Sequence, residues 1–379
     1  MASSANHRVH GMGTEMEAPT WPAITAAEAE AAIARFASAG RMVALRWHSP
    51  RPFSAATLVD TTRGAFFLKR HHHKLRSIEG LAEEHAFIAH LRAAGTPVPE
   101  VMLAADGMSA IAVGDWTYEL HRKGQGVDRY RDRLSWTPFL SRSHARAAGA
   151  ALARLHSASA SFAAPARKPR PLVASFTILP ATDPMAAAEA YVAARPALAG
   201  SLTDRAWQSD LARLFAASGD GLPAALAGQP SLWTQNDWHP SNLLWADDGT
   251  VATAFDFGLA DRTCAVHDIA TAIERSCVRW LDLGQDAAIG DARAAVDLLT
   301  GYATVLPLSR TDIATIVRLL PLVHVEFALS EVDYFSGVVA DPVSAALAWD
   351  DYLIGHGDWF ITAPGQNFLR RIDDEEVGR

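Results

Sequence analysis

The chain has 379 residues, and its 42 acidic side chains outnumber its 34 lysines and arginines, which gives a formal net charge of −8. A chain of this length exceeds what one hydrophobic core comfortably fills, so we expect two lobes. The acidic balance argues against a nucleic-acid partner, because phosphate backbones require clustered Lys and Arg. No stretch approaches roughly 18 consecutive apolar residues, which argues against a membrane span.

Residues 1–20 are polar and show no apolar pattern, so we expect a disordered tail. This segment lacks the apolar region of a secretory signal peptide. The two cysteines, Cys264 and Cys277, show no CxxC spacing and are expected to be buried thiols. Together these features favour a cytoplasmic protein.

Residues 21–121 predict a first lobe that is built mainly of strands. A capping box at Thr25-Ala-Ala-Glu28 opens a short helix ahead of it. A second helix ends at Gly95. Five strand-like runs are expected around these helices, at residues 42–46, 55–60, 65–70, 101–104 and 115–121.

Lys69 is a lone cation at the end of an apolar strand. In the helix that follows, Glu84 falls on the apolar stripe formed by Leu81, Ile88 and Leu91. A carboxylate on a buried stripe requires a partner, since an unpaired buried charge is costly. We therefore predict a Lys69–Glu84 ion pair. The alternative for Lys69 is an edge-strand lysine that faces water.

Three adjacent histidines, His71, His72 and His73, lie within the basic segment of residues 70–76. Adjacent side chains cannot easily converge on one ion, and no acidic residue or cysteine accompanies them. We interpret the segment as a solvated basic turn rather than as a metal site.

Residues 122–379 predict a second, mostly helical lobe. One helix is expected from Ser141 to His156, and the Ala-, Pro- and Ser-rich residues 157–183 predict a surface loop. Further helices are expected at residues 184–194, 204–217, 268–283, 291–305, 311–337 and 342–362.

The stretch Trp233-Thr-Gln-Asn-Asp-Trp-His-Pro-Ser-Asn-Leu-Leu-Trp245 reads as two short strands around a polar loop. A turn at Asp247-Asp-Gly249 leads into a third strand that stops at Asp256, the first residue of Asp-Phe-Gly. Asp237, Asn242 and Asp256 should therefore lie close together at strand ends. Phosphoryl transfer requires such a set, with one carboxylate to deprotonate a hydroxyl and an amide oxygen and a second carboxylate to hold Mg²⁺.

The spacing Asp-x4-Asn, followed by Asp-Phe-Gly, matches the catalytic and metal loops of kinase folds. With the sequence Asp237-Trp-His-Pro-Ser-Asn-Leu-Leu-Trp245, the chain resembles the aminoglycoside phosphotransferase and choline kinase superfamily. Within it, the chain is most similar to the homoserine kinase type II and stress-response-kinase-like branch. The resemblance covers most of residues 40–360 and implies an α+β, bilobal, protein-kinase-like fold. Its small lobe would hold five antiparallel strands and one helix, and its large lobe would be mostly helical.

This resemblance implies that ATP and Mg²⁺ bind between the lobes. Asp237 would be the catalytic base, and Asn242 and Asp256 would be the metal ligands. Lys69, aligned by Glu84, would contact the α- and β-phosphates. The connector at residues 122–126 would be the hinge, and the adenine edge would meet backbone groups there, at about Glu119, Leu120, His121 and Arg122.

Two residues beside Asp237 leave alternatives open. Family members usually carry His two residues before the catalytic Asp, where this chain has Gln235. Because Gln also donates and accepts hydrogen bonds, it can replace that His in the loop, although the change leaves room for a weakened enzyme. His239 is interpreted as a loop-packing residue that fixes Asp237, and direct contact with phosphate or acceptor is the alternative.

The chain reaches His267-Asp268 soon after Asp256-Phe-Gly, which leaves no room for the activation segment that holds a peptide in protein kinases. The acceptor is therefore predicted to be a small molecule. Asp268 is expected to be the N-cap of the next helix. The resemblance implies that it also braces the catalytic loop.

The C-terminal helices combine acidic and aromatic residues that would suit an amine-bearing acceptor. Besides His239, the candidates are Glu326, Glu331, Asp333, Tyr334 and Trp359. Surface carboxylates and core aromatics explain the same residues equally well.

We therefore predict an ATP- and Mg²⁺-dependent kinase that phosphorylates a hydroxyl of a small acceptor, such as homoserine, an amino alcohol or an aminoglycoside-like molecule. The alternative is a catalytically weak or dead nucleotide-binding module that acts by interaction. The presence of all the charged catalytic groups favours the enzyme. No sequence feature chooses between a monomer and a homodimer.

Overall fold

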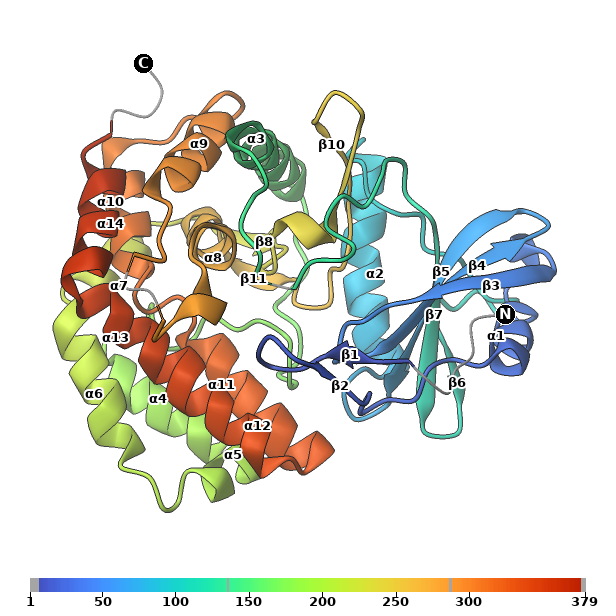
Figure 1. Ribbon diagram of the computed structural model, residues 1–379, viewed down its shortest axis with the longest axis horizontal. Helices are drawn as coiled ribbons and strands as arrows, with labels where there is room; N and C mark the ends of the chain where they lie inside the picture. Colours follow the sequence, from blue (N-terminus) through green and yellow to red (C-terminus); the bar gives the residue numbers. More distant parts are fainter. Residues whose placement is uncertain (1–6, 135, 286–287, 376–379) are drawn as a thin grey trace. The chain divides into compact units, whose positions relative to one another are not determined.

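The computed structural model describes residues 7–134, 136–285 and 288–375, and the chain divides into two compact units (Figure 1). Unit 1 comprises residues 1–125 and 253–255, and unit 2 comprises residues 126–252 and 256–379. The first unit thus extends slightly beyond the predicted boundary at residue 121. Among the described residues, no helix has the length and hydropathy that crossing a membrane requires.

Unit 1 contains a five-stranded antiparallel sheet in the order β3-β4-β5-β7-β6. Its strands are β3 (Met42–His48), β4 (Ala55–Thr61), β5 (Gly64–His72), β6 (Ile111–Val113) and β7 (Trp116–Arg122). Its helices are α1 (Ala26–Ile33), a 3-10 turn (Ala37–Ala39) and α2 (Ile78–Ala93). The predicted small lobe of five strands with a helix is confirmed.

One of the five predicted strands is misplaced. Residues 101–104 supply only a single bridge, between Val101 and His121, and the fifth strand is β6. The Met102 N–H donates to β7 and the Glu100 carbonyl accepts from it, but these bonds span too few residues to make a strand.

The N-terminal segment also differs from its prediction. Residues 9–10 and 16–17, expected to be part of a disordered tail, pair as β1 (Val9–His10) and β2 (Met16–Glu17). Residues 1–6 of that predicted tail lie outside the described residues.

The two faces of the five-stranded sheet are covered by different helices. Phe66 and Leu120 face α1 and belong to the apolar core of the unit. Because side chains alternate along a strand, Glu119 and His121 point to the opposite face. There Glu119 contacts His85 of α2.

Helix α1 is fixed to the sheet through its first turn. The predicted capping box is present, since Thr25 and Glu28 each accept a hydrogen bond from the backbone of the other. Glu28 also accepts bonds from Arg70 at 2.6 Å and from the Tyr118 hydroxyl at 2.7 Å. The sequence signal for the helix start therefore also marks its attachment to β5 and β7.

Unit 2 is mostly helical, and two short strand pairs carry its polar loops. β8 (Ser231–Thr234) pairs with β11 (Asp261–Cys264), and β9 (Leu243–Trp245) pairs with β10 (Val251–Ala254). The longer helices are α3 (Arg142–Ser159), α4 (Pro184–Ala193), α6 (Trp207–Ser218), α8 (Ala265–Cys277), α9 (Ala292–Ala303), α10 (Arg310–Leu319), α11 (Val325–Tyr334) and α14 (Ala363–Asp373). The shorter ones are α5 (Pro196–Ser201), α7 (Leu222–Ala227), α12 (Pro342–Leu347) and α13 (His356–Ile361). Short 3-10 turns (Pro240–Asn242 and Trp280–Asp282) and π-helical turns (Phe335–Val339 and Ala348–Gly355) complete the list.

The single helix predicted at residues 311–337 is interrupted. α10 ends at Leu319 and α11 begins at Val325, because Pro321 lacks the backbone N–H that would continue the helix. The turn between them carries His324, which becomes important below. The predicted buried state of Cys264 and Cys277 is confirmed.

Helices α3 and α9 approach each other through one glycine from each. A Cβ atom on Gly149 would lie 1.9 Å from the Leu298 carbonyl, and one on Gly301 would lie 1.9 Å from the Arg146 carbonyl. Any larger side chain would therefore push the helices apart. This close packing fixes α3, whose last turns carry His156 of the candidate site.

Candidate functional site

The site is centred on the loop between β8 and β9. The Asn242 side-chain nitrogen donates to the Asp237 carboxylate at 2.9 Å and to the Asp237 carbonyl at 3.0 Å. Two of the predicted residues are thus in contact. Because the amide nitrogen of Asn242 is used in this way, its oxygen is the atom that it can offer to a metal ion.

A cation that the sequence analysis missed holds Asp237. Arg275 Nη2 lies 3.0 Å from Asp237 Oδ1, and His239 Nε2 lies 3.6 Å from the same oxygen. Burial raises the pKa of Asp237, but the charge of Arg275, followed by His239 and Asn242, brings it below its ordinary value. Asp237 is therefore a carboxylate, which is the form that a general base requires.

The sequence feature that could have identified Arg275 was its spacing from Asp268. It follows Asp268 by seven residues in α8, and two helical turns place both residues on one face. His239 is buried and contacts both Asp237 and the Ser241 hydroxyl, the latter at 2.8 Å. These contacts support the loop-packing interpretation of His239.

Gln235 links the two predicted loops. Its side chain is fully buried, donates to the Asp256 carbonyl at 2.6 Å and accepts from the Asp237 backbone N–H at 2.8 Å. One bond uses the amide nitrogen and the other the amide oxygen, as expected for a Gln that replaces His. The backbones that carry Asp237 and Asp256 are thereby joined by one side chain.

Two non-glycine residues of these loops have left-handed backbone conformations. The φ angle is +59° at Asn236 and +60° at Asp256, which follows β10 by two residues. Asn and Asp adopt this region more readily than other residues do. Such conformations persist where surrounding contacts hold them and are often found at functional sites.

Asp268 braces the Asp237 loop but is not a helix cap. Strand β11 runs directly into α8, so the N-cap is Cys264 and the predicted cap at Asp268 is wrong. The buried Asp268 carboxylate instead accepts from the backbone N–H of Gln235 at 3.1 Å and of Asn236 at 2.8 Å. It also lies 3.0 Å from His156 Nε2. The bracing role that the resemblance implied is confirmed.

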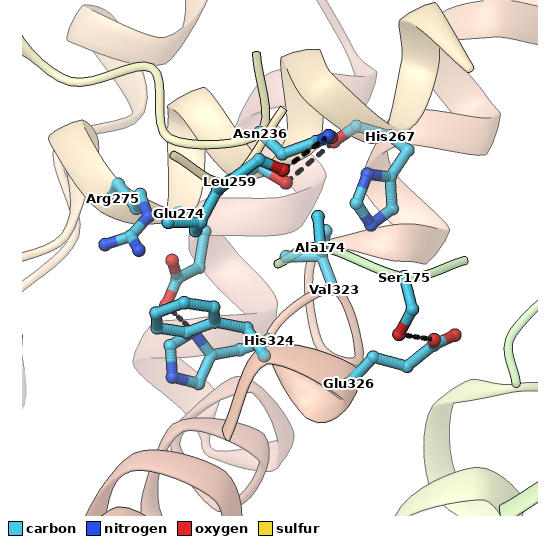
Figure 2. Close-up of a pocket in the computed structure, with 12 residues that line it drawn as sticks. Ala174, Ser175, Asn236, Leu259, His267, Glu274, Arg275, Val323, His324 and Glu326 are labelled. Atoms are coloured by element: carbon cyan, nitrogen blue, oxygen red, sulfur yellow. Dashed lines mark hydrogen bonds and ion pairs between the residues drawn. The ribbon is translucent and has the colours of Figure 1, made fainter. Parts of the chain in front are cut away.

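A pocket of about 380 Å³, including its open mouth, lies beside Arg275 within unit 2 (Figure 2). Its lining comes from the loop after α3, the loop after β8, α8 and the start of α11. It includes Ser175, Asn236, His267, Arg275, Glu326 and Phe327. Asn236 and Arg275 both belong to the surroundings of Asp237, so the pocket adjoins the candidate base.

Glu326 fixes one wall of this pocket. Its carboxylate accepts from the backbone N–H of Thr177 at 2.8 Å and of Ile178 at 2.6 Å, and from the Ser175 hydroxyl at 2.5 Å. Glu326 therefore has a structural role, and its contact with an acceptor stays a prediction.

The sequence itself matches a family model over a long range. The model of the phosphotransferase enzyme family matches residues 52–308, which is more than half of the chain. The chain belongs to the phosphotransferase enzyme family. The predicted enzyme class is thereby confirmed, and no curated protein matches the chain.

Solved structures similar to this phosphotransferase share its fold. A microcompartment-associated aminopropanol kinase is 19% identical, with a TM-score of 0.59 over 91% of this chain and 100% of that chain. An amicoumacin kinase in complex with AMP-PNP, Ca²⁺ and Ami is 17% identical, with a TM-score of 0.52 over 88% of each chain. An aminoglycoside phosphotransferase from Alicyclobacillus acidocaldarius is 17% identical, with a TM-score of 0.51 over 90% of this chain and 94% of that chain. The predicted α+β, kinase-like fold is confirmed.

In unit 1 of the phosphotransferase, Lys69 lies in the middle of the sheet. β5 runs between β4 and β7, so the alternative of an edge-strand lysine is wrong. Lys69 Nζ lies 3.6 Å from Glu119 Oε1, an ion pair that was not predicted. Glu84 is buried in α2 as expected, and its pairing with Lys69 stays a prediction.

Besides Lys69, three imidazole rings contact the Glu119 carboxylate. Its carboxylate lies 2.9 Å from His71 Nε2, 2.7 Å from His85 Nε2 and 2.7 Å from His121 Nε2. Burial raises the pKa of Glu119, but the charges of His121 and Lys69, together with the hydrogen bonds, hold it well below its usual range.

The interpretation of residues 70–76 as a solvated turn holds only for the turn at residues 73–75, where His73 and Lys74 are exposed, and is wrong for the rest. β5 continues to His72, and Arg70, His71 and Arg76 are buried. Alternation along the strand sends Arg70 to Glu28 on one face and His71 to Glu119 on the other.

Residues 119–122, whose backbone groups were predicted to meet the adenine edge, lie within β7. The Leu120 carbonyl accepts from the Met102 N–H, and the Arg122 N–H donates to the Glu100 carbonyl, both at 2.8 Å. On the other edge this stretch pairs with β5. The Leu120 carbonyl and the Arg122 N–H are thus already used within the unit, and the adenine contact of this stretch stays a prediction.

The predicted acceptor residues of the C-terminal helices fall into two groups. Glu331 is buried 3.9 Å from His324, which lines the pocket, and Asp333 is half-buried. Tyr334 and Trp359 are buried aromatics, and Trp359 packs against other rings. Neither is among the described residues that line the pocket, so the core interpretation holds for these two.

Proposed function

We propose that this phosphotransferase transfers the γ-phosphoryl group of ATP to a hydroxyl group of a small molecule and requires Mg²⁺. The observation that carries the proposal is the state of Asp237, which is mostly buried, ionised and in contact with Asn242. Gln235 ties this loop to Asp256, so a base and two oxygen ligands belong to one bonded assembly.

Each residue has a separate role in the proposal. Asp237 orients the acceptor hydroxyl and takes its proton. The Asn242 oxygen and the Asp256 carboxylate hold Mg²⁺, since this ion prefers oxygen ligands. When bound, the ion neutralises charge that develops on the phosphate oxygens. Lys69, aligned by Glu84, contacts the phosphates, and the connector at residues 122–126 provides the backbone contact for adenine.

The pocket beside Arg275 is the proposed acceptor site. It adjoins the base and already contains polar and aromatic groups, as small-molecule pockets do. Similar folds carry the names aminopropanol kinase and aminoglycoside phosphotransferase, so amino alcohols and aminoglycosides lead the panel of acceptors to test. Homoserine and choline complete that panel.

The test combines ADP release across this panel with nucleotide binding by three variants. Asp237→Asn should abolish turnover while nucleotide affinity stays nearly unchanged. Asp256→Asn should lose Mg²⁺-dependent nucleotide binding. Asp248→Asn is the matched control, because Asp248 lies in the exposed β9–β10 turn and bonds only locally to Thr250.

Full turnover by Asp237→Asn would overturn the assignment of the base. Nucleotide binding by the unaltered protein without turnover on any acceptor would instead support the alternative, a non-catalytic nucleotide-binding module.

A further inference from the structure

Three buried side chains that commonly bind metals meet at the wall of the pocket. They are Glu274 of α8, His324 of the turn before α11, and His356 of α13, and we call them the Glu274 cluster. One ligand atom of each lies within 4.8 Å of the other two. His356 Nδ1 is 2.9 Å and His324 Nδ1 is 3.6 Å from the same oxygen, Glu274 Oε1.

We propose that the Glu274 cluster is a binding site for a divalent transition-metal ion such as Zn²⁺. Zinc takes imidazole nitrogen and carboxylate oxygen at about 2.0–2.2 Å in a tetrahedral arrangement, which places its ligands roughly 3.4 Å apart. The two measured separations, 2.9 and 3.6 Å, lie on either side of that spacing. Small side-chain shifts would therefore admit the ion. Two imidazoles select zinc-like metals over Mg²⁺, which prefers oxygen.

The second nitrogen of His324 already has a carboxylate nearby. His324 Nε2 lies 3.9 Å from Glu331 Oε2, and neither atom has a hydrogen-bond partner among the residues that the structure describes. A metal-bound imidazole usually donates its other N–H to a carboxylate or carbonyl. Metal binding at Nδ1 would place the proton on Nε2 and so give both atoms a partner.

Carboxyl groups outnumber cations around the Glu274 cluster. Asp237, Glu274 and Glu331 supply three carboxyl groups, whereas Arg275 is their nearby cation and is already paired with Asp237. Burial raises the pKa of Glu274 and, to about 8, that of Glu331. A bound divalent ion would stabilise both carboxylates.

The cluster has an entry route, because Glu274 and His324 also line the pocket. Figure 2 shows their polar groups facing each other beside Arg275. With three protein ligands, a tetrahedral ion keeps a fourth position for water or a small ligand. The proposal does not depend on the proposed function, since binding is measured without nucleotide or acceptor.

A second group of this type, His85, Glu119 and His121 in unit 1, provides a matched control. There the carboxylate already receives three imidazole contacts and has Lys69 at 3.6 Å. The nearby Lys69 charge opposes a metal ion, and so do the hydrogen bonds that the Glu119 carboxylate already makes. We therefore expect this second group to stay metal-free.

The experiment is calorimetric titration of metal-free protein with Zn²⁺ in excess Mg²⁺, which saturates oxygen-rich sites but competes poorly for imidazole. We expect one Zn²⁺ per chain. Glu331→Gln should weaken binding roughly 10- to 100-fold, as loss of a partner behind a metal ligand does. His324→Gln should weaken it more, and His85→Gln should leave it unchanged.

The absence of Zn²⁺ binding by the unaltered protein, or equal binding by His324→Gln, would overturn the proposal. Loss of binding in His85→Gln would assign the metal to unit 1 instead and would also overturn it. Should His324→Gln fail to fold by circular dichroism, the visible spectrum of Co²⁺ in the unaltered protein decides. Intense four-coordinate bands support the site, and weak octahedral bands contradict it.

Discussion

Arg275 Nη2 lies 3.0 Å from Asp237 Oδ1, and both side chains are largely shielded from water. A carboxylate paired with a guanidinium is stabilised in its ionised form and is therefore a weaker base. Arg275 also stacks over the Phe327 ring with its Cζ 4.8 Å from the ring centre, which holds the guanidinium in place. The basicity of Asp237 is thus set by a residue on another element.

Replacing Arg275 should move the pH dependence of turnover. In Arg275→Gln the burial that raises the pKa of Asp237 remains, but the main opposing charge is gone, so this pKa rises. Because the base must be ionised, the acidic limb of the kcat/KM profile shifts to higher pH. The measurement is kcat/KM against pH. Arg279→Gln is the control, since Arg279 forms an exposed pair with Asp282, and an identical shift in both variants would refute the assignment.

Gln235 should be replaceable by His but not by Ala. In Gln235→Ala the Asp237 N–H and the Asp256 carbonyl lose their partners in a buried place. We expect kcat to fall by roughly 10- to 100-fold, which corresponds to about 1.4–3 kcal/mol. Gln235→His should retain most activity, because imidazole can also donate and accept. Steady-state kinetics of the two variants, beside Gln229→Ala with its single peripheral bond to Asp312, would check this.

Removing the negative charge of Asp268 should destabilise unit 2. In Asp268→Asn, one oxygen that accepts from Gln235, Asn236 or His156 becomes an NH2 group and faces a donor. A buried donor without an acceptor costs about 1–3 kcal/mol. We expect the free energy of unfolding to fall by that amount in a urea titration. Asp350→Asn, which loses only an exposed pair with Arg205, should change it little, and equal losses would contradict the bracing role.

Glu331 should make stability fall as pH rises. Burial raises its pKa from 4.5 to about 8, so between these values the folded protein holds a proton that the unfolded chain has released. This stabilising contribution is complete below pH 4.5 and is lost as the pH rises through about 8. In Glu331→Gln that loss should be absent. Urea unfolding of both proteins across this range, with a chelator present, is the measurement, and parallel curves would contradict it.

The sequence predicted features that depend on near neighbours. The capping box at Thr25, the β9–β10 hairpin and the hydrogen bonding of Gln235 follow from residue types at fixed short spacings. Contacts within the Asp237 loop were foreseeable for the same reason. The fold class was implied by the family resemblance that the Asp237 and Asp256 motifs carry, and the separate strand and helix runs agree with it.

Side-chain partners that come from distant elements could not be predicted from short sequence spacings. Arg275 follows Asp237 by a strand pair and most of a helix, and Glu119 meets imidazoles from three elements. Sequence shows which side chains need a partner but not which partner tertiary packing brings. The position of β5 inside the sheet, and hence the burial of His71, depends on strand order, which no local pattern encodes.

The bonds from Glu326 to Ser175, Thr177 and Ile178 have a thermodynamic consequence for recognition. They hold the loop after α3 against α11 before a ligand binds. Binding therefore does not have to pay the entropy cost of ordering that loop. A rigid wall also discriminates by shape, because a molecule that is too wide cannot be accommodated by loop movement. On this side of the proposed acceptor site, selectivity would therefore be set before the acceptor binds.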